Sequence, residues 1–202
     1  MLLLWDVDTQ IDFLAPRGRL YMPGAEKILP NLGRLTRWAA EHRVPIIASV
    51  DAHLPGDPEL QIYGEHCMVG TPGQQKAPET LLPDCFVVPN RPIELPDLRS
   101  FQQIVIEKQA FDFSTNPNHR QVLRQFSWPL EIKLYGVATD ICVAAAARSL
   151  LDLGHKVSLV IDAVAELDAR EAQAFLREFA GRGGSLMTTA DVMASCKALP
   201  SR

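Results

Sequence analysis

The fold is decided by one stretch of the sequence, IKLYGVATDICVA, which spans residues 132–144. Residues 132–137 form a short apolar run that is typical of a buried strand, and an alanine-rich helical segment follows from Ala144. Cys142 is therefore expected in the first turn of a helix, just after the carboxyl end of a strand. Unpaired N–H groups and a partial positive charge at a helix N-terminus favour thiolate over thiol. The stretch thus predicts a reactive thiol at a strand end.

Short apolar runs alternate with amphipathic segments along most of the chain. The expected strands cover residues 2–7, 44–50, 104–106, 132–137, 157–161 and 185–187. The expected helices cover residues 28–39, 144–153 and 168–179, with two more beginning after residue 117 and at residue 189. This alternation, with continuous apolar strands, predicts a parallel sheet covered by helices on both faces. Functional sites in such folds lie beyond the carboxyl ends of the strands.

The composition is that of an ordinary folded protein. Hydrophobic residues make up 47% of the 202 residues, charged residues make up 22%, and the formal net charge is −4. This mild charge offers no basic field for nucleic acid, and no apolar run approaches the length of a membrane span. The apolar start, residues 1–5, is too short for a signal peptide, so we expect a cytoplasmic protein. The four cysteines are then expected to be free thiols.

Charged residues end two other expected strands. Asp8 follows the first strand, and Lys108 follows the strand at residues 104–106. Taken singly, an aspartate at a strand end is more often a cap or a turn residue, and a lysine there is more often a surface residue. If both instead face Cys142, the carboxylate can take the thiol proton while the ammonium group holds the charge balance.

The second expected strand leads into a candidate metal site. Residues i and i+2 of an extended chain point the same way, so Asp51 and His53 present a carboxylate and an imidazole to one point. Further candidate ligands follow in a proline-rich segment: Glu59 and His66, with Asp57 and Cys67 as competitors. An isolated Asp-x-His pair is more often an ordinary loop pair, but the nearby candidates favour metal binding. Mixed nitrogen and oxygen ligands suit zinc, iron or manganese better than calcium.

Other kinds of site lack their motifs. The sequence has no G-x-G-x-x-G after the first strand, no P-loop and no G-x-S-x-G. A dinucleotide-binding protein and a serine hydrolase are therefore disfavoured. The segment at about residues 51–100 has many prolines and little periodicity, and a loop of that length in a compact domain is usually functional or disordered.

Several of these segments together resemble the isochorismatase-like cysteine hydrolases. The catalytic triad of that family is matched by Asp8 in VDTQIDF, by Lys108, and by Cys142 in GVATDICV. The segments DAH at 51–53 and HCMVGTPG at 66–73 resemble the metal-binding branch of the family, the nicotinamidases. The resemblance covers nearly the whole chain in order.

The resemblance implies a single domain over residues 1–202, folded as a three-layer α/β/α sandwich with a largely parallel sheet of about six strands. It implies a cis peptide bond before Ala138, an oxyanion hole formed by the backbone N–H groups of Ala138 and Cys142, and Phe13 as a substrate contact. The implied metal ligands are Asp51, His53, Glu59 and His66. Glu59 stands where nicotinamidases often carry a third histidine. Zinc is the first expectation for the metal, with iron and manganese as alternatives.

The reaction implied by the resemblance is hydrolysis of a small carboxamide, with nicotinamide as the type substrate, through a thioester on Cys142. The expected partner is a small-molecule amide, with no nucleic acid and no membrane, and the family suggests a homo-oligomer. Two alternatives stay open: hydrolysis of another amide or an N-carbamoyl compound, and a non-catalytic binding domain on the same fold. Isochorismate cleavage is disfavoured because that chemistry does not need a cysteine nucleophile.

Overall fold

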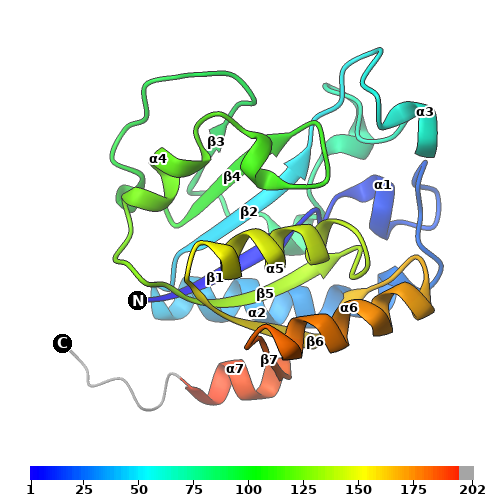
Figure 1. Ribbon diagram of the computed structural model, residues 1–202. Coiled ribbons are helices and arrows are strands. Elements are labelled where there is room, and N and C mark those ends of the chain that lie inside the picture. Colours follow the sequence, from blue (N-terminus) through cyan, green and yellow to red (C-terminus); the bar gives the residue numbers. More distant parts are fainter. Residues whose placement is uncertain (196–202) are drawn as a thin grey trace.

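The computed structural model describes residues 1–195 and is built on one seven-stranded sheet (Figure 1). Its strands are β1 (Leu2–Val7), β2 (Ile46–Asp51), β3 (Cys85–Val88), β4 (Gln103–Lys108), β5 (Glu131–Val137), β6 (Lys156–Ala165) and β7 (Ser185–Met187). They lie in the order β3-β4-β2-β1-β5-β6-β7, and every neighbouring pair is parallel. The predicted parallel sheet is confirmed. The strand that the sequence pattern misses is β3, a four-residue strand at the sheet edge.

Helices connect the strands. The α-helices are α1 (Ile11–Leu14), α2 (Leu29–His42), α3 (Leu60–Tyr63), α4 (His119–Arg124), α5 (Cys142–Asp152), α6 (Ala169–Gly181) and α7 (Thr189–Ser195). Short 3-10 helices are η1 (Ala25–Ile28), η2 (Pro72–Gln74), η3 (Pro78–Thr80), η4 (Leu98–Ser100) and η5 (Phe113–Thr115). Asp168 caps α6, because its carboxylate accepts hydrogen bonds from the N–H groups of Arg170 and Glu171 in the first turn of that helix.

Two hydrophobic cores lie on opposite faces of the sheet and give the three layers. Alternate residues of β1 divide between them: Leu3, Trp5 and Val7 join one core, and Leu4 joins the other. The first core packs against residues of α4, α5 and α6, and the second packs against residues of α2 and α7 (Figure 1). This is the expected α/β/α sandwich.

The strand ends determine where polar chemistry can gather. Because all strands are parallel, the carboxyl ends of β1, β2, β4 and β5 meet at one edge of the sheet. Asp8 directly follows β1, and Cys142 begins the helix that follows β5. Asp51 and Lys108 are the last residues of β2 and β4 and are register partners across that pair. Four chemically active side chains thus start from adjacent strands.

The carboxyl end of β5 depends on a glycine. Gly136 has φ of +118°, and a Cβ atom there would lie 2.0 Å from the carbonyl oxygen of Val7. Only glycine allows β5 to pass β1 at this distance with this backbone conformation. The peptide bond between Val137 and Ala138, where the strand ends, is cis, as the resemblance implies. Gly136 therefore sets the path of the chain toward Cys142.

Three of the four cysteines fall within the described residues. Cys67, Cys85 and Cys142 are free thiols, as predicted, and Cys196 lies outside the described residues. In the same part of the chain, we find no helix with the length and apolar character that crossing a membrane requires.

Replacement of Gly136 by alanine tests this close approach. Gly136→Ala is expected to lower the free energy of unfolding by at least about 2 kcal/mol, because steric overlap adds to the cost of a positive φ. Gly154→Ala is the matched control: Gly154 also has a positive φ, +81°, but a Cβ there would meet nothing within 4 Å. Urea unfolding of both variants gives the comparison. Equal losses in the two variants would contradict the role given to Gly136.

Candidate active site

Lys108 lies at the centre of a fully buried polar cluster. Its Nζ atom is 2.8 Å from Oδ2 of Asp8, donates a hydrogen bond to Oδ1 of Asp51, and lies 3.7 Å from Sγ of Cys142. The structure thus brings together the three residues that the sequence analysis predicts as a triad. Each comes from a different strand end, so only the parallel sheet makes them neighbours.

Asp8 is held in place by its backbone and by a further side chain. It has φ of +51°, a region that non-glycine residues seldom adopt, and such strain is concentrated at functional sites. Its Oδ1 atom accepts a hydrogen bond of 2.9 Å from the hydroxyl of Ser49, and its own N–H donates to the Ser49 carbonyl oxygen. One carboxylate oxygen therefore serves Ser49, and the other faces Lys108.

The charges of this cluster do not balance by themselves. Burial lowers the pKa of Lys108, but the carboxylates of Asp51 and Asp8 outweigh it and hold that pKa well above its ordinary value. Burial raises the pKa of Asp51 to about 7, with Lys108 opposing the rise and Asp8 adding to it. One ammonium group faces two carboxylates, so the cluster has room for one more positive charge beside Asp51.

The state of Cys142 differs from the sequence-based prediction. It is the first residue of α5, as predicted, but it is only 6% exposed. Burial raises the pKa of its thiol well above the ordinary value; Lys108 opposes this, and the nearby carboxylates of Asp8 and Asp51 add to it. The raised pKa favours the protonated thiol. A carboxylate oxygen of Asp8 and one of Asp51 lie within 4.8 Å of its sulfur, so two carboxylates are near enough to take its proton.

A second polar cluster adjoins the first and includes the four residues predicted as metal ligands. One ligand atom from each of Asp51, His53, Glu59 and His66 lies within 4.8 Å of the others, and all four residues are buried. Nε2 of each histidine lies 4.0 Å from Oδ2 of Asp51, and the distances to Oε1 of Glu59 are 3.9 and 3.7 Å. Tetrahedral zinc ligation places ligand atoms about 3.3–3.5 Å apart, so small movements complete the site.

The hydrogen bonds of the two histidines fit such a site. Nδ1 of His53 contacts Oδ2 of Asp57 at 3.1 Å, and Nδ1 of His66 contacts the Gly64 carbonyl oxygen at 2.9 Å. Both partners accept, so Nδ1 carries the proton and Nε2 offers its lone pair to the cluster. Nε2 of both histidines and Oδ2 of Asp51 are buried without a hydrogen-bond partner. Unpartnered buried atoms are costly, and a divalent cation satisfies all three.

The two competitors for the metal site take other roles. Asp57 orients the His53 ring through Nδ1 and is 3.1 Å away on the side opposite to the ligating nitrogen. Cys67 turns its sulfur toward the carbonyl oxygen of Gly73, and burial raises the pKa of its thiol far beyond its ordinary value. Neither residue joins the cluster of candidate ligands.

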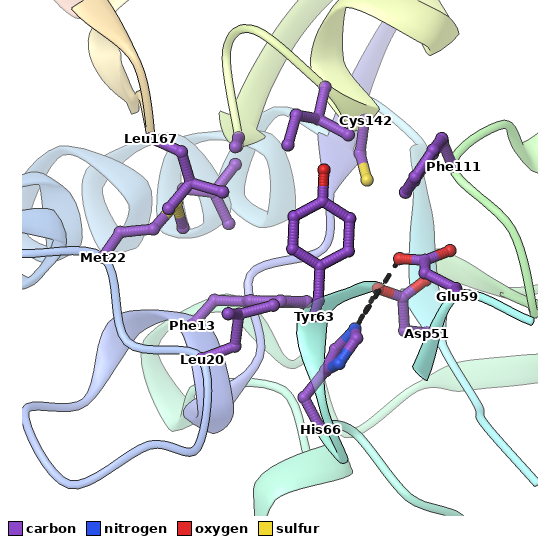
Figure 2. A pocket seen from close by; sticks show the side chains of 13 residues that line it. Phe13, Leu20, Met22, Asp51, Glu59, Tyr63, His66, Phe111, Cys142 and Leu167 are labelled. Atoms are coloured by element: carbon purple, nitrogen blue, oxygen red, sulfur yellow. Dashed lines mark ion pairs between the residues drawn. The ribbon is translucent and has the colours of Figure 1, made fainter. Parts of the chain in front are cut away.

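A small pocket opens over both clusters (Figure 2). It has about 330 Å³ of empty volume, part of it open to solvent. Its lining comprises Phe13, Leu20, Met22, Asp51, Glu59, Tyr63, His66, Phe111, Val137, Ala138, Ile141, Cys142 and Leu167. Phe13 lines the pocket, and its ring centre is 5.5 Å from that of His66. Tyr63 and Phe111 pack edge to face, with ring centres 6.0 Å apart. These aromatic side chains form part of the pocket wall.

Several residues around the site are not apparent from the sequence pattern. Gln10 holds both backbone groups of Asp51: its Oε1 accepts from the Asp51 N–H at 2.7 Å, and its Nε2 donates to the Asp51 carbonyl oxygen at 2.8 Å. Ser49 looks like an ordinary strand residue. Leu20, Met22 and Leu167 come from distant segments without periodicity. Only the position of Gln10, two residues after Asp8, is a usable signal.

Removal of the Lys108 ammonium group tests the charge balance of the buried cluster. Lys108→Met leaves two buried carboxylates unpaired, so the metal-free protein should lose about 3–5 kcal/mol of unfolding free energy at pH 7. Without this cation, burial keeps the folded-state pKa of Asp51 above its unfolded value, so stability falls as pH rises; the loss should be smaller at pH 5.

Urea unfolding in chelator at the two pH values measures both effects. Lys133→Met is the control, because Lys133 is also buried but pairs with the half-exposed Glu131, and its loss should be below about 1 kcal/mol. A Lys108→Met variant as stable as the wild type at pH 7 would contradict this account of the cluster.

Comparison with known proteins agrees with the fold and the site. The model of the isochorismatase domain matches residues 1–191. The nicotinamidase of Escherichia coli strain K12 is 28% identical in an alignment of 205 positions, gaps included. The alignment covers 92% of this chain and 93% of that protein. The crystal structure of a Pyrococcus horikoshii pyrazinamidase in complex with zinc superposes with a TM-score of 0.74 at 26% identity, covering 93% of this chain and 98% of that one. For the N-carbamoylsarcosine amidase of Thermoplasma acidophilum, the TM-score is 0.72 at 26% identity, with coverages of 93% and 96%. With most of its length matched, the chain belongs to the isochorismatase family of hydrolases.

Proposed function

We propose that this protein is a cysteine-dependent amidohydrolase of the nicotinamidase type, which converts nicotinamide and water to nicotinate and ammonia. The observation that carries the proposal is the buried contact of Lys108 with both Asp8 and Cys142, of which Cys142 lines a small pocket. An acid, an ammonium group and a thiol in this arrangement supply a base, a charge balance and a nucleophile.

The first half of the reaction acylates the thiol. Asp8 takes the proton from Cys142, and the sulfur attacks the amide carbon to form a C–S bond. The negative charge on the former carbonyl oxygen is stabilised by the backbone N–H groups of Ala138 and Cys142, which in well-studied sites contribute roughly 3 kcal/mol each. Asp8 then returns its proton to the nitrogen, the C–N bond breaks, and ammonia leaves.

The second half regenerates the enzyme. Asp8 removes a proton from a water molecule, whose oxygen attacks the thioester carbon. The C–S bond breaks, the carboxylate product leaves, and the sulfur of Cys142 regains a proton. Lys108 keeps its charge throughout and stabilises Asp8 in its ionised form.

We propose that Asp51, His53, Glu59 and His66 hold a divalent metal ion, with zinc as the first expectation and iron or manganese as alternatives. Support comes from the unpartnered ligand atoms of Asp51, His53 and His66, from the closeness of Glu59 to them, and from the zinc in the pyrazinamidase structure. A bound cation supplies a Lewis-acidic anchor for a substrate heteroatom and the positive charge that the clusters lack. Asp51 and Glu59 provide its charge compensation, and the histidines provide neutral nitrogen ligands.

The pocket lining favours an aromatic amide over the N-carbamoyl amino acids. Its walls beyond the polar clusters are apolar, and among the described residues that line it there is no lysine or arginine. A substrate that carries its own carboxylate would bury that charge without a lysine or arginine partner, beside a metal whose charge Asp51 and Glu59 already compensate, at a cost of at least about 3 kcal/mol. A non-catalytic binding domain would not need the buried triad, which is costly to assemble. The pocket therefore supports a nicotinamidase over an N-carbamoyl hydrolase, and the triad supports an enzyme over a non-catalytic binding domain.

Three other expectations stay predictions: one domain over residues 1–202, a homo-oligomer, and a cytoplasmic location. The small-molecule amide stays the proposed partner.

Loss of the nucleophile should abolish turnover. Cys142→Ala is expected to fold normally and to reduce ammonia release from nicotinamide at least about 10³-fold, because both half-reactions use the sulfur. Cys85→Ala is the matched control, since Cys85 lies on the edge strand β3 away from the pocket. A coupled ammonia assay measures both. Activity that survives in Cys142→Ala would remove this residue from the mechanism.

Substrate preference separates the two enzymatic alternatives. The wild type should show a kcat/KM for nicotinamide at least about 100-fold higher than for N-carbamoylsarcosine, as the cost of an unpaired carboxylate requires. Leu167→Arg adds a cation at the pocket wall and should narrow this difference. Steady-state ammonia release from both compounds gives the ratio. Faster turnover of N-carbamoylsarcosine than of nicotinamide by the wild type would instead favour an N-carbamoyl hydrolase.

A further inference from the structure

Asp12 is a buried acid that the proposed mechanism does not use. It lies on α1 beside the pocket residue Phe13 and is 5% exposed. No cation pairs with it among the described residues, because the guanidinium group of nearby Arg19 binds Glu65. Burial of a carboxylate without a cation costs free energy, so the hydrogen bonds of Asp12 indicate its structural role.

Both oxygens of Asp12 accept backbone N–H groups. Oδ2 accepts from Cys67 at 2.7 Å, and Oδ1 accepts from Arg19 at 3.0 Å. The carboxylate also lies directly against Gly73, where a Cβ atom would come within 2.2 Å of it. Asp12 therefore joins α1 to two points of the proline-rich segment, Cys67 and Gly73.

The contact with Cys67 is one peptide bond away from a candidate metal ligand. Cys67 directly follows His66 and has φ of +45°, which a side chain seldom adopts without support. Its N–H donates to Asp12, and its carbonyl oxygen accepts from the His53 N–H at 3.1 Å. The two histidine ligands are thus connected through Cys67, and Asp12 fixes that connection from the other side.

We propose that Asp12 is a positioning residue for the metal site, holding the His66–Cys67 peptide so that Nε2 of His66 faces Asp51. This inference rests on the proposed metal site but not on the hydrolytic reaction. A carboxylate is required because two N–H groups must be accepted at two oxygens. Asparagine offers one oxygen and one NH₂ group, so one of the two N–H groups would face a donor.

The test is the zinc affinity of the purified protein, measured by competition with a chromophoric chelator and without substrate. Asp12→Asn should weaken the zinc Kd about 10–100-fold, as losses around metal ligands commonly do. Zinc in excess should restore its ammonia release. Val157→Ala controls for general destabilisation, because it removes buried methyl groups at the start of β6, and its Kd should stay within twofold of the wild type.

A second variant reaches the same contact from the opposite side. Gly73→Ala should push the Asp12 carboxylate away from the Cys67 N–H and weaken zinc binding in the same direction. Gly181→Ala, where a Cβ meets nothing within 4 Å, should have no effect. If Asp12→Asn fails to fold, the Gly73→Ala result decides.

The proposal is overturned by an unchanged Kd in Asp12→Asn, by an equal loss in Val157→Ala, or by a wild type without measurable zinc affinity. A wild type that binds zinc tightly but releases no ammonia from any amide would instead refute the hydrolase proposal and leave this one standing.

Discussion

The ammonium group of Lys108, buried between two carboxylates and a thiol, is the constraint on which the rest of the site depends. Without it, Asp8 and Asp51 would lie side by side in a solvent-free space, which is electrostatically unfavourable. Lys108, at the end of β4, contacts Asp8 after β1 and Asp51 at the end of β2. Its Nζ atom also lies 3.7 Å from Sγ of Cys142, at the start of the helix that follows β5. The parallel sheet brings these strand ends together, and the charge of Lys108 offsets the repulsion between the two buried carboxylates.

Asp51 connects the two clusters because its two oxygens have different neighbours. Oδ1 accepts from Lys108, while Oδ2 is unpartnered and faces the histidines. Gln10 fixes the Asp51 backbone through both of its polar groups. A metal bound at Oδ2 therefore completes the charge balance of the Lys108 cluster as well. The proposed catalytic residues and the candidate metal ligands then form one electrostatic unit.

Much of this arrangement follows from local sequence patterns. The strand ends that carry Asp8, Lys108 and Cys142 are recognisable from short apolar runs, and parallel pairing then brings the ends together. The set of metal ligands follows from the Asp-x-His spacing together with the resemblance to nicotinamidases. Strand β3 is missed because four residues are too few to show a pattern. Contacts such as Ser49 to Asp8 depend on which strands are neighbours, which a linear sequence does not state. The protonation of Cys142 is also beyond local reasoning, because the burial that raises the pKa of its thiol is set by tertiary packing.

The central claim is that the sulfur of Cys142 carries the acyl group during turnover. The most direct measurement is mass spectrometry of the protein quenched in acid during turnover of nicotinamide, followed by proteolytic mapping. The account predicts a nicotinoyl group on the peptide that contains Cys142, absent when turnover is complete and absent in the protein without this thiol. Steady ammonia release with no acyl adduct, or with the adduct on another residue, would contradict it.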